Sequence, residues 1–389
     1  MKILQVLPYF KPAYSFGGPI KLVDQLSTEL TRRGHEVVIY TSDARDKNSR
    51  LHTCEINAMG LQEGIKTYYF KNVSMIFVNK FNFFIVPELN SRIKKEIQNF
   101  DIVHLHDFRT YHNLVCYYYA KKYNIPYVVQ AHGSIPRYGK KILKMFYDKL
   151  FSYRLLQNSS KIVVLNSMEY KQCIEMGLSR DKIVIIPNGI NKTEYDNIDL
   201  KGYFRNKFGI GHDDKIILFV GRLHESKGLD YLIKSYSIVS DHFINSKLVI
   251  VGPDDGFASN IHHLIQQFNL TDKVILTSFL PNKDKMSAFV DSDVFVTPIF
   301  YGFPITFLES CLAGCPIVTT SKDLDWIHNN VGLVTNKSIK SLAYGILLIL
   351  NNEDLRNKFS VNCINIANKY DIKNIVNMFE NLYRIILNK

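Results

Sequence analysis

The sequence predicts an α/β protein built from two Rossmann-like domains, each with a mostly parallel sheet. Short apolar runs that suit buried strands alternate with segments of helical spacing along most of the chain. The alternation comes in two blocks, and the polar stretch Lys192–Leu200 between them is the expected linker. With 389 residues the chain is long enough for two domains of ordinary size. We expect the strand ends of both domains to face a central cleft, the usual ligand site of such a pair.

The first block opens with a βαβ pattern. Lys2–Leu7 is a short apolar run that predicts a buried strand, and Ile20–Arg33 has helical apolar spacing that ends at Gly34. Between them, Gly17-Gly18-Pro19 leads into the helix, where backbone N–H groups favour a phosphate. Two glycines before a helix are also common turn chemistry. The further elements expected in this block are strands at Glu36–Thr41, Ile65–Phe70, Ser74–Val78, Asp101–His106, Tyr127–His132, Lys161–Leu165 and Lys182–Ile186, helices at Val86–Asn99 and Ile142–Leu156, and irregular structure over residues 44–64.

Two of these strands end in histidine. Asp101–His106 is followed by Asp107, and Tyr127–His132 is followed by Gly133. In an open parallel sheet, ligands bind beyond the carboxyl ends of the strands. His132 is therefore a candidate binding residue, and Gly133 would let a ligand approach the backbone closely. The alternative is a histidine that only forms hydrogen bonds within a turn.

The formal charge of +12 is unevenly distributed. Residues 1–195 contain 28 Lys and Arg against 16 Asp and Glu, a difference of +12, whereas residues 196–389 contain 20 of each. Such an excess favours an anionic partner: nucleic acid, an anionic membrane surface or a phosphorylated substrate. A solvated basic face without a partner is the alternative. The helix expected at Ile142–Leu156 mixes bases with aromatic residues, which indicates either a membrane-surface helix or a surface helix whose aromatic residues face the core.

The second block restarts the alternation with a strand at Lys215–Val220. The loop Gly221–Gly228 follows, and its Arg222 and Lys227 could pair with a diphosphate through charge-assisted hydrogen bonds. The elements expected after this loop are helices at Leu229–Val239, Ile261–Phe268 and about Lys373–Leu387, and strands at Lys247–Val251, Lys273–Thr277 and Val294–Thr297.

A strand, loop and helix at Val296–Val318 form the other candidate site of this block. The loop contains Gly302 and Pro304, and the helix carries Glu309 about one turn in. We expect Pro304 in the first helical turn, where a backbone N–H group would have no intrahelical acceptor. A helix start can hold an anion, and Glu309 can accept hydrogen bonds from a ribose diol. An ordinary βαβ connection is the alternative for this stretch alone.

Composition argues against several classes of protein. The six cysteines are scattered without a Cys-x-x-Cys pair, so neither a zinc site nor a disulfide framework is expected. No apolar run approaches the roughly 18 residues of a spanning helix. The apolar start Met1–Pro8 is too short for a signal peptide, so we expect a cytoplasmic protein.

Six short pieces of the sequence together resemble one enzyme family. In chain order they are Gly17-Gly18-Pro19, Ala131-His132-Gly133, Pro187-Asn188-Gly189-Ile190, Val220-Gly221-Arg222 with Lys227-Gly228, Val251-Gly252-Pro253, and the stretch through Glu309 to Gly314 and Pro316. Each piece alone is a weak signal, but their order and spacing are specific. Over nearly its whole length the chain resembles the retaining glycosyltransferases of the GT-B fold, in particular family 4 (glycosyl transferases group 1).

The resemblance implies different roles for the two domains. Residues 1–195 would be an acceptor-binding domain, and residues 196–371 would bind a nucleotide diphosphate sugar, usually UDP- or GDP-linked. The last helix, about 372–389, would pack back on the N-terminal domain. Such enzymes keep the anomeric configuration and generally need no metal, because cationic side chains neutralise the leaving diphosphate. No cofactor is expected beyond the nucleotide sugar as co-substrate.

The resemblance also assigns residues. It implies that Arg222 and Lys227 hold the diphosphate, that Glu309 holds the ribose and that His132 contacts the donor sugar; these four form the expected catalytic set. The wider donor site is expected to comprise Gly17, Gly18, Gly221, Tyr301, Gly302, Phe303, Pro304, Ile305 and Thr306, and the acceptor site Tyr14, Asp107 and Arg137. Tyr301 is a departure, because it stands where the family pattern of Glu, seven residues, Glu has its first glutamate. A tyrosine cannot act as a charged acceptor, so the choice of donor sugar is open.

The leading hypothesis is transfer of a sugar, with retention, to a lipid-linked oligosaccharide in surface polysaccharide or O-antigen assembly. The basic N-terminal half motivates the lipid, because that half binds the acceptor in this fold, and it suggests a peripheral position at the inner face of the cell membrane. A catalytically weak homologue that binds nucleotide or glycan as a partner subunit is the alternative, supported by Tyr301 alone. A nucleic-acid binder would explain the charge, but no recognisable nucleic-acid module is present in the sequence.

Overall fold

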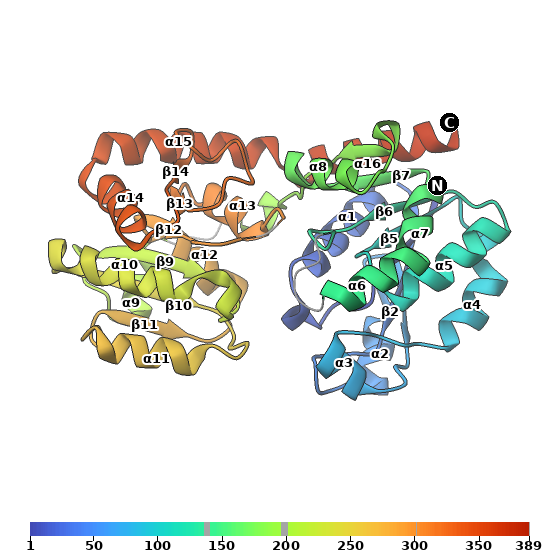
Figure 1. The fold of residues 1–389 in the computed structure, drawn as a ribbon, viewed down its shortest axis with the longest axis horizontal. Helices are drawn as coiled ribbons and strands as arrows, with labels where there is room; N and C mark the ends of the chain where they lie inside the picture. Colours follow the sequence, from blue (N-terminus) through green and yellow to red (C-terminus); the bar gives the residue numbers. More distant parts are fainter. Residues whose placement is uncertain (136–140, 196–200, 301, 389) are drawn as a thin grey trace. The chain divides into compact units, whose positions relative to one another are not determined.

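The computed structural model describes residues 1–135, 141–195, 201–300 and 302–388, and it divides the chain into two compact units (Figure 1). The first unit comprises Met1–Gly189 and Ile372–Lys389, and the second comprises Ile190–Asp371. Each unit has its own sheet and its own apolar core. The chain therefore returns to the first unit for its last helix.

The first unit is organised around an eight-stranded sheet with the order β3-β4-β2-β1-β5-β6-β7-β8. All neighbouring strands are parallel except β3 and β4. The central strand β1 is almost continuously apolar and buried, as expected for a parallel strand covered on both faces. The strands are β1 (Lys2–Val6), β2 (Glu36–Ser42), β3 (Leu61–Gln62), β4 (Ile65–Phe70), β5 (Ile102–His106), β6 (Tyr127–Gln130), β7 (Lys161–Val164) and β8 (Ile183–Ile185).

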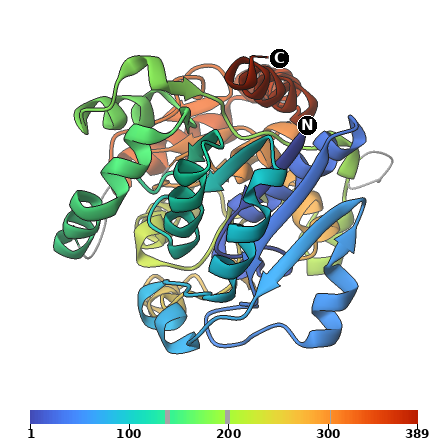
Figure 2. The same cartoon turned by 90° about the vertical axis from the view of Figure 1, so that its right-hand side faces the viewer.

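Helices cover both faces of this sheet (Figure 2). The core on one face contains Leu4 and Val103 from the strands with Ile93, Cys116 and Leu155 from helices α4, α5 and α7. The helices of the unit are α1 (Pro19–Arg32), α2 (Thr53–Met59), α3 (Met75–Phe81), α4 (Glu88–Glu96), α5 (Tyr111–Lys122), α6 (Lys141–Tyr147), α7 (Tyr153–Asn158), α8 (Ser167–Glu175) and α16 (Ile372–Leu387). Short 3-10 turns lie at Tyr14–Phe16, Ile97–Asn99 and Arg180–Lys182, and a π-helical turn lies at Asp148–Ser152.

Two local predictions in this unit were wrong. Ser74–Val78 is not a strand: Ser74 is the N-cap of α3, and its hydroxyl accepts a hydrogen bond from the Ile76 N–H. The β-branched and aromatic run favoured a strand locally, but the capped helix supplies its own backbone hydrogen bonds. Residues 44–64 are not wholly irregular, because they contain α2 and β3.

Helix α16 supports the opposite face of the sheet. Phe379 and Tyr383 are buried, and the Phe379 ring lies 5.4 Å from that of His104 on β5. At the end of α1, Arg33 and His35 bind the Glu380 carboxylate at 2.5 and 2.7 Å. Figures 1 and 2 both show α16 (dark red) beside the N-terminus. The C-terminal helix is thus an integral part of the first unit.

The second unit contains a six-stranded, fully parallel sheet with the order β11-β10-β9-β12-β13-β14. Its strands are β9 (Lys215–Val220), β10 (Ser246–Val251), β11 (Val274–Thr277), β12 (Val294–Val296), β13 (Ile317–Thr319) and β14 (Gly332–Val334). Its helices are α9 (Tyr203–Phe208), α10 (Leu229–His242), α11 (Ala258–Gln267), α12 (Asn282–Val290), α13 (Ile305–Leu312), α14 (Ile339–Asn351) and α15 (Glu353–Lys369), with 3-10 turns at Lys192–Tyr195 and Glu225–Lys227.

Among the described residues, no helix combines the length and the hydropathy that a membrane span requires.

We expect Phe379→Ala to destabilise the first unit by about 3–5 kcal/mol, because it empties a fully buried site between α16 and β5. Met378→Ala on the same helix removes a side chain that is 39% exposed and should cost much less. Amide hydrogen exchange in β1 and β5 measures this unit directly and avoids a two-domain unfolding transition. Equal losses of protection in the two variants would show that the α16 contact is not part of the core.

Candidate functional site

In the second unit, the loops that follow β9 and β10 are joined by backbone hydrogen bonds. The Leu223 N–H donates to Pro253 O at 2.9 Å, and the Asp255 N–H donates to Leu223 O at 3.1 Å. The two loops meet closely because Gly252 has no side chain: a Cβ there would lie 1.9 Å from Gly221 O, and φ is +150°. Gly221, a predicted donor residue, is thus part of a fixed double loop at the carboxyl edge of the sheet.

This double loop carries both predicted diphosphate ligands. Arg222 donates to the Asp255 carboxylate at 2.6 Å and is 42% exposed, so its guanidinium is oriented and still accessible. Lys227 ends the 3-10 turn Glu225–Lys227. Burial lowers the pKa of Lys227 to about 8, and repulsion from Arg222 acts in the same direction. Two cations that repel each other at a strand end are the environment that an anion would stabilise.

The helix start predicted near Pro304 lies in the same unit. Pro304 is the N-cap of α13 with extended backbone angles, so it precedes the helix rather than occupying its first turn. Its side chain can form no capping hydrogen bond, which leaves the amides of Ile305 and Thr306 without a cap from that residue. Phe303 is buried and packs on Trp326 and Tyr370. Gly302 has φ +72°, a left-handed conformation that a glycine adopts without strain.

Glu309 lies within α13 and is almost completely buried. Its side chain is 2% exposed, and Lys285 of α12 donates to Oε1 at 2.8 Å. Burial of the carboxylate is compensated by this ion pair. The carboxylate therefore belongs to a charged pair inside the unit, a feature that spacing in the sequence does not reveal.

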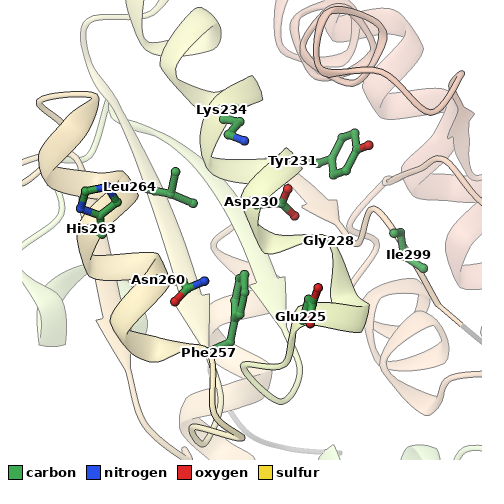
Figure 3. A pocket seen from close by; sticks show the side chains of 10 residues that line it. All are labelled: Glu225, Gly228, Asp230, Tyr231, Lys234, Phe257, Asn260, His263, Leu264 and Ile299. Carbon is green, nitrogen blue, oxygen red and sulfur yellow. The ribbon is translucent and has the colours of Figure 1, made fainter. Parts of the chain in front are cut away.

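A pocket of about 550 Å³ opens beside the Arg222–Lys227 loop (Figure 3). Helices α10 and α11 form its walls, and Glu225, Asp230 and Lys234 contribute charges to it. Its described lining includes Gly228 but not Arg222, Lys227 or Glu309. With two carboxylates, Glu225 and Asp230, this pocket is a poor seat for a diphosphate.

In the first unit, His132 lies just beyond the carboxyl end of β6. Its φ is +50°, and Gly133 follows at φ +82°. Its Nε2 lies 2.8 Å from Nδ1 of His106, the last residue of the neighbouring strand β5. Burial lowers the pKa of His132 to about 3, so the imidazole is neutral at physiological pH. A left-handed conformation in a non-glycine residue at a strand end is typical of a functional site.

Glu169 of α8 lies beside the backbone that follows His132. Its carboxylate accepts a hydrogen bond from the Leu165 N–H at 2.7 Å, and the Gly133 N–H lies near enough to lower its pKa. Burial raises the pKa of Glu169 to about 7. No pattern in the sequence pointed to this residue, because it lies on a helix 36 positions after Gly133 (169 − 133).

Asp107 follows β5 and also has a left-handed backbone, with φ +61°. Burial raises the pKa of its carboxyl to about 6, and a hydrogen bond from Tyr9 opposes that shift. Because β5 and β6 are parallel neighbours, Asp107 and His132 leave the sheet at the same edge.

The other predicted residues of this unit lie after β1. Gly17 has φ +126°, and Gly18 is the N-cap of α1, with Pro19 as its first residue. Tyr14 is 51% exposed in the turn before them. Two of the predicted residues, Arg137 and Tyr301, lie outside the described residues.

Comparison with known proteins identifies the family of the chain. Residues 16–194 match the family described as Glycosyltransferase Family 4, and residues 201–365 match the family Glycosyl transferases group 1. The chain belongs to glycosyltransferase family 4. The uncharacterized glycosyltransferase MJ1607 of Methanocaldococcus jannaschii is 28% identical over 410 residues, covering 100% of this chain and 99% of the relative.

Solved structures show the same fold. HepE of Anabaena in complex with UDP is similar with a TM-score of 0.79 and 16% identity, over 98% of this chain and 99% of that one. WaaG, a glycosyltransferase involved in lipopolysaccharide biosynthesis, is similar with a TM-score of 0.69 and 17% identity, over 99% of both chains. The predicted GT-B fold is therefore confirmed.

The family-4 protein is thus a retaining glycosyltransferase that takes its sugar from a nucleotide sugar, and its family typically works without a metal. Four residues beyond the predicted set take part in the geometry of the candidate site: His106, Glu169, Asp255 and Lys285. Only His106 was visible in the sequence, as the polar end of a strand.

We expect Asp107→Asn to stabilise the protein at neutral pH. The raised pKa means that the folded state binds more protons than the unfolded state between about pH 4 and 6, so stability falls as pH rises through that window. The neutral amide avoids this loss, and asparagine tolerates a positive φ. We predict a gain of about 1–3 kcal/mol at pH 7.5 that vanishes near pH 4, measured by chemical denaturation. A gain that is the same at both values would assign the effect to something other than charge.

Proposed function

We propose that this enzyme transfers a hexose from a UDP- or GDP-linked sugar to a lipid-linked oligosaccharide at the cytoplasmic face of the cell membrane, in the assembly of a surface polysaccharide of the O-antigen type. The observation that carries the lipid part is a group of exposed apolar side chains at the carboxyl edge of the first unit's sheet. Family membership supplies the transfer chemistry.

The main group, the α6 patch, consists of Ile142, Met145, Phe146, Leu150 and Phe151. Their exposed fractions are 69, 48, 58, 60 and 45%. The spacing of i, i+3, i+4 and i+8 puts the first four on one side of the helical segment, and Phe151 follows Leu150 in the π-helical turn. The alternative that its aromatic residues face the core is wrong for Phe146 and Phe151, which are exposed.

The segment that presents the α6 patch is anchored to the site. Its π-helical turn begins at Asp148, which is buried and accepts two hydrogen bonds from Arg109, at 2.7 and 2.9 Å. Arg109 also donates to the backbone oxygen of Ile135 at 2.9 Å, in the loop that follows His132. An apolar surface held this firmly beside a strand end can contact a membrane while the site meets the head of a lipid acceptor.

A second exposed group lies on and beside α3: Val73, Ile76, Phe77 and Phe81. Helix α3 follows β4, and α6 follows β6, and both strands are parallel to the rest of the sheet. The two groups therefore leave the sheet at the same edge as His132. A soluble sugar acceptor would not require this apolar surface, whereas a membrane does.

The donor side rests on the second unit. We assign the diphosphate to Arg222 and Lys227, and the ribose to Glu309, oriented by Lys285. His132 and the loop Gly17–Gly18 contact the donor sugar and the phosphates. The UDP named for the HepE complex supports a uridine donor, and the role in lipopolysaccharide biosynthesis named for WaaG supports the pathway.

We predict that binding of UDP weakens above pH 8 with uptake of a proton. Lys227 has its pKa lowered to about 8 in the free protein, and the diphosphate raises that pKa again, so binding above pH 8 must restore the proton. Affinity should fall by up to about tenfold per pH unit there. Calorimetry in buffers of different ionisation enthalpy measures both quantities.

Lys227→Arg should remove the pH dependence, because arginine stays protonated. The matched control is Lys234→Arg, which changes a residue of the Figure 3 pocket and should leave the dependence intact. A wild-type affinity that is constant from neutral pH to above the Lys227 pKa would place the diphosphate elsewhere.

If the α6 patch contacts a membrane, the double variant Phe146→Ser, Leu150→Ser should bind phosphatidylglycerol vesicles at least about tenfold more weakly, because it removes two apolar side chains from the contact. The control is Tyr118→Ser with Ile385→Ser, which removes an aromatic and an aliphatic side chain of comparable exposure, 59 and 68%, elsewhere on the first unit. Sedimentation with vesicles at low and high salt measures binding, and transfer to a soluble acceptor tests activity. Equal binding by both double variants would contradict membrane contact through the α6 patch.

A further inference from the structure

A chain of buried polar side chains extends from His132 into the first unit. His106 Nδ1 lies 2.8 Å from His132 Nε2, and His106 Nε2 lies 2.7 Å from Oε1 of Gln5 on β1. His106 and Gln5 are completely buried. The three side chains come from the ends of β6, β5 and β1, which are consecutive strands of the sheet.

The chain has a direction. An amide oxygen can only accept, so the hydrogen between Gln5 and His106 must be on His106 Nε2. Burial lowers the pKa of His106 well below its ordinary value and that of His132 to about 3, so each ring carries one proton. His106 Nδ1 is then an acceptor, and His132 must donate from Nε2. The Nδ1 atom of His132 is left with a lone pair.

Two further buried side chains, His104 and Tyr383, support this orientation of the Gln5 amide. His104 Nδ1 lies 2.8 Å from the Tyr383 hydroxyl. Burial lowers the pKa of His104 and raises that of Tyr383; nearby Gln130 opposes the first shift, as an acceptor would, and nearby Gln5 opposes the second, as a donor would. In normal hydrogen-bond geometry, Gln5 Nε2 and His104 Nε2 have no partner among the described residues, so these two interactions are long. They nevertheless place the Gln5 amino group towards Tyr383 and its oxygen towards His106.

We propose that Gln5 and His106 are positioning residues that hold His132 as the Nε2–H tautomer, so that His132 Nδ1 accepts a hydrogen bond from a hydroxyl group of the bound sugar. The inference rests on the proposed contact between His132 and the donor sugar. It adds a chemical restriction: His132 recognises a hydroxyl donor and cannot donate to a phosphate oxygen or to another acceptor.

The backbone around His132 is consistent with this role. The backbone of His132 is left-handed, with φ +50°, and the next N–H group, that of Gly133, lies near the Glu169 carboxylate. A conformation that costs of order 1 kcal/mol persists only where the surrounding contacts determine it. The hydrogen bond to His106 and the Glu169 contact supply that constraint.

The tautomer can be measured without any substrate. Protonated and unprotonated ring nitrogens have well-separated ¹⁵N shifts, so histidine-labelled protein reports each of the 12 rings, and His132→Gln identifies the His132 signals. We expect a protonated Nε2 and an unprotonated Nδ1, unchanged between about pH 5.5 and 8 because burial keeps the ring neutral. A protonated Nδ1 on His132, or titration within that range, would overturn the inference.

Gln5→Leu tests the positioning role, because it removes the acceptor that fixes His106. We expect the two His132 nitrogen shifts to move towards each other as both tautomers become populated. The kcat/KM for the nucleotide sugar should fall by roughly two- to tenfold, in proportion to the competent fraction. Gln25→Leu makes the same change at another buried glutamine of the first unit and should alter neither quantity. An unchanged tautomer in Gln5→Leu would show that Gln5 does not act on His132.

The experiments distinguish a failure of the proposed donor function from a failure of the positioning role of Gln5 and His106. If no nucleotide sugar binds or reacts, the proposed donor function fails, while the wild-type ¹⁵N spectrum still decides the tautomer. If transfer is normal but His132 carries its proton on Nδ1, the donor function stands and the positioning role is wrong. The labelled wild-type protein gives this result even if a variant does not fold.

Discussion

The position of every candidate residue depends on one constraint, the reversal of strand order at β1 in the first sheet and at β9 in the second. Strand β1 lies between β2 and β5, and β9 lies between β10 and β12. Right-handed crossovers that start on opposite sides of such a strand leave space beyond its carboxyl end. The loops after β1, β5 and β6 form the candidate site of the first unit, and those after β9, β10 and β12 form that of the second. Both sets therefore lie at the carboxyl edge of their own sheet.

The two units differ in the charge of their buried titratable groups. In the first unit, burial keeps His104, His106 and His132 neutral, and His106 forms hydrogen bonds with both His132 and Gln5. In the second, Lys227 retains its charge near pH 7 despite burial and despite Arg222. A neutral network suits the recognition of hydroxyl groups, and a pair of neighbouring cations suits a diphosphate. The electrostatics therefore fit the proposed division between sugar recognition in the first unit and leaving-group stabilisation in the second.

Much of this arrangement could be predicted from the sequence, because strand positions and strand-end residues are local features. Val220 and Gln130 end the strands β9 and β6. The residues directly after them, Gly221-Arg222 and Ala131-His132, can therefore be located from the sequence alone. Partners were not predictable: Lys285 lies 24 residues before Glu309 (309 − 285), and His106 lies 26 before His132 (132 − 106). Spacing gives no information on such pairs, since they depend on which helices or strands become neighbours. The α3 error had a related cause, because a run with strand propensity was overruled by the N-cap at Ser74.

The charge excess of residues 1–195 is a count of bases and acids, and it does not show which bases are exposed to a partner. Residues 108–147 contain no Asp or Glu, and Arg109 is one of the bases in this stretch. Its guanidinium nevertheless pairs with Asp148, the first acidic residue after the stretch. Lys149 and Arg154 are exposed bases of the described segment at α6 and α7, and each is worth about 1 kcal/mol at an anionic surface and is screened by salt. Five exposed apolar side chains add a contribution of about 25 cal/mol per Å² buried, which salt does not screen. Neither term alone gives stable attachment, since one signal gives only reversible membrane binding and stable anchoring takes two. The arrangement around α6 places both at the carboxyl edge of the first unit's sheet, as the proposed lipid acceptor would require.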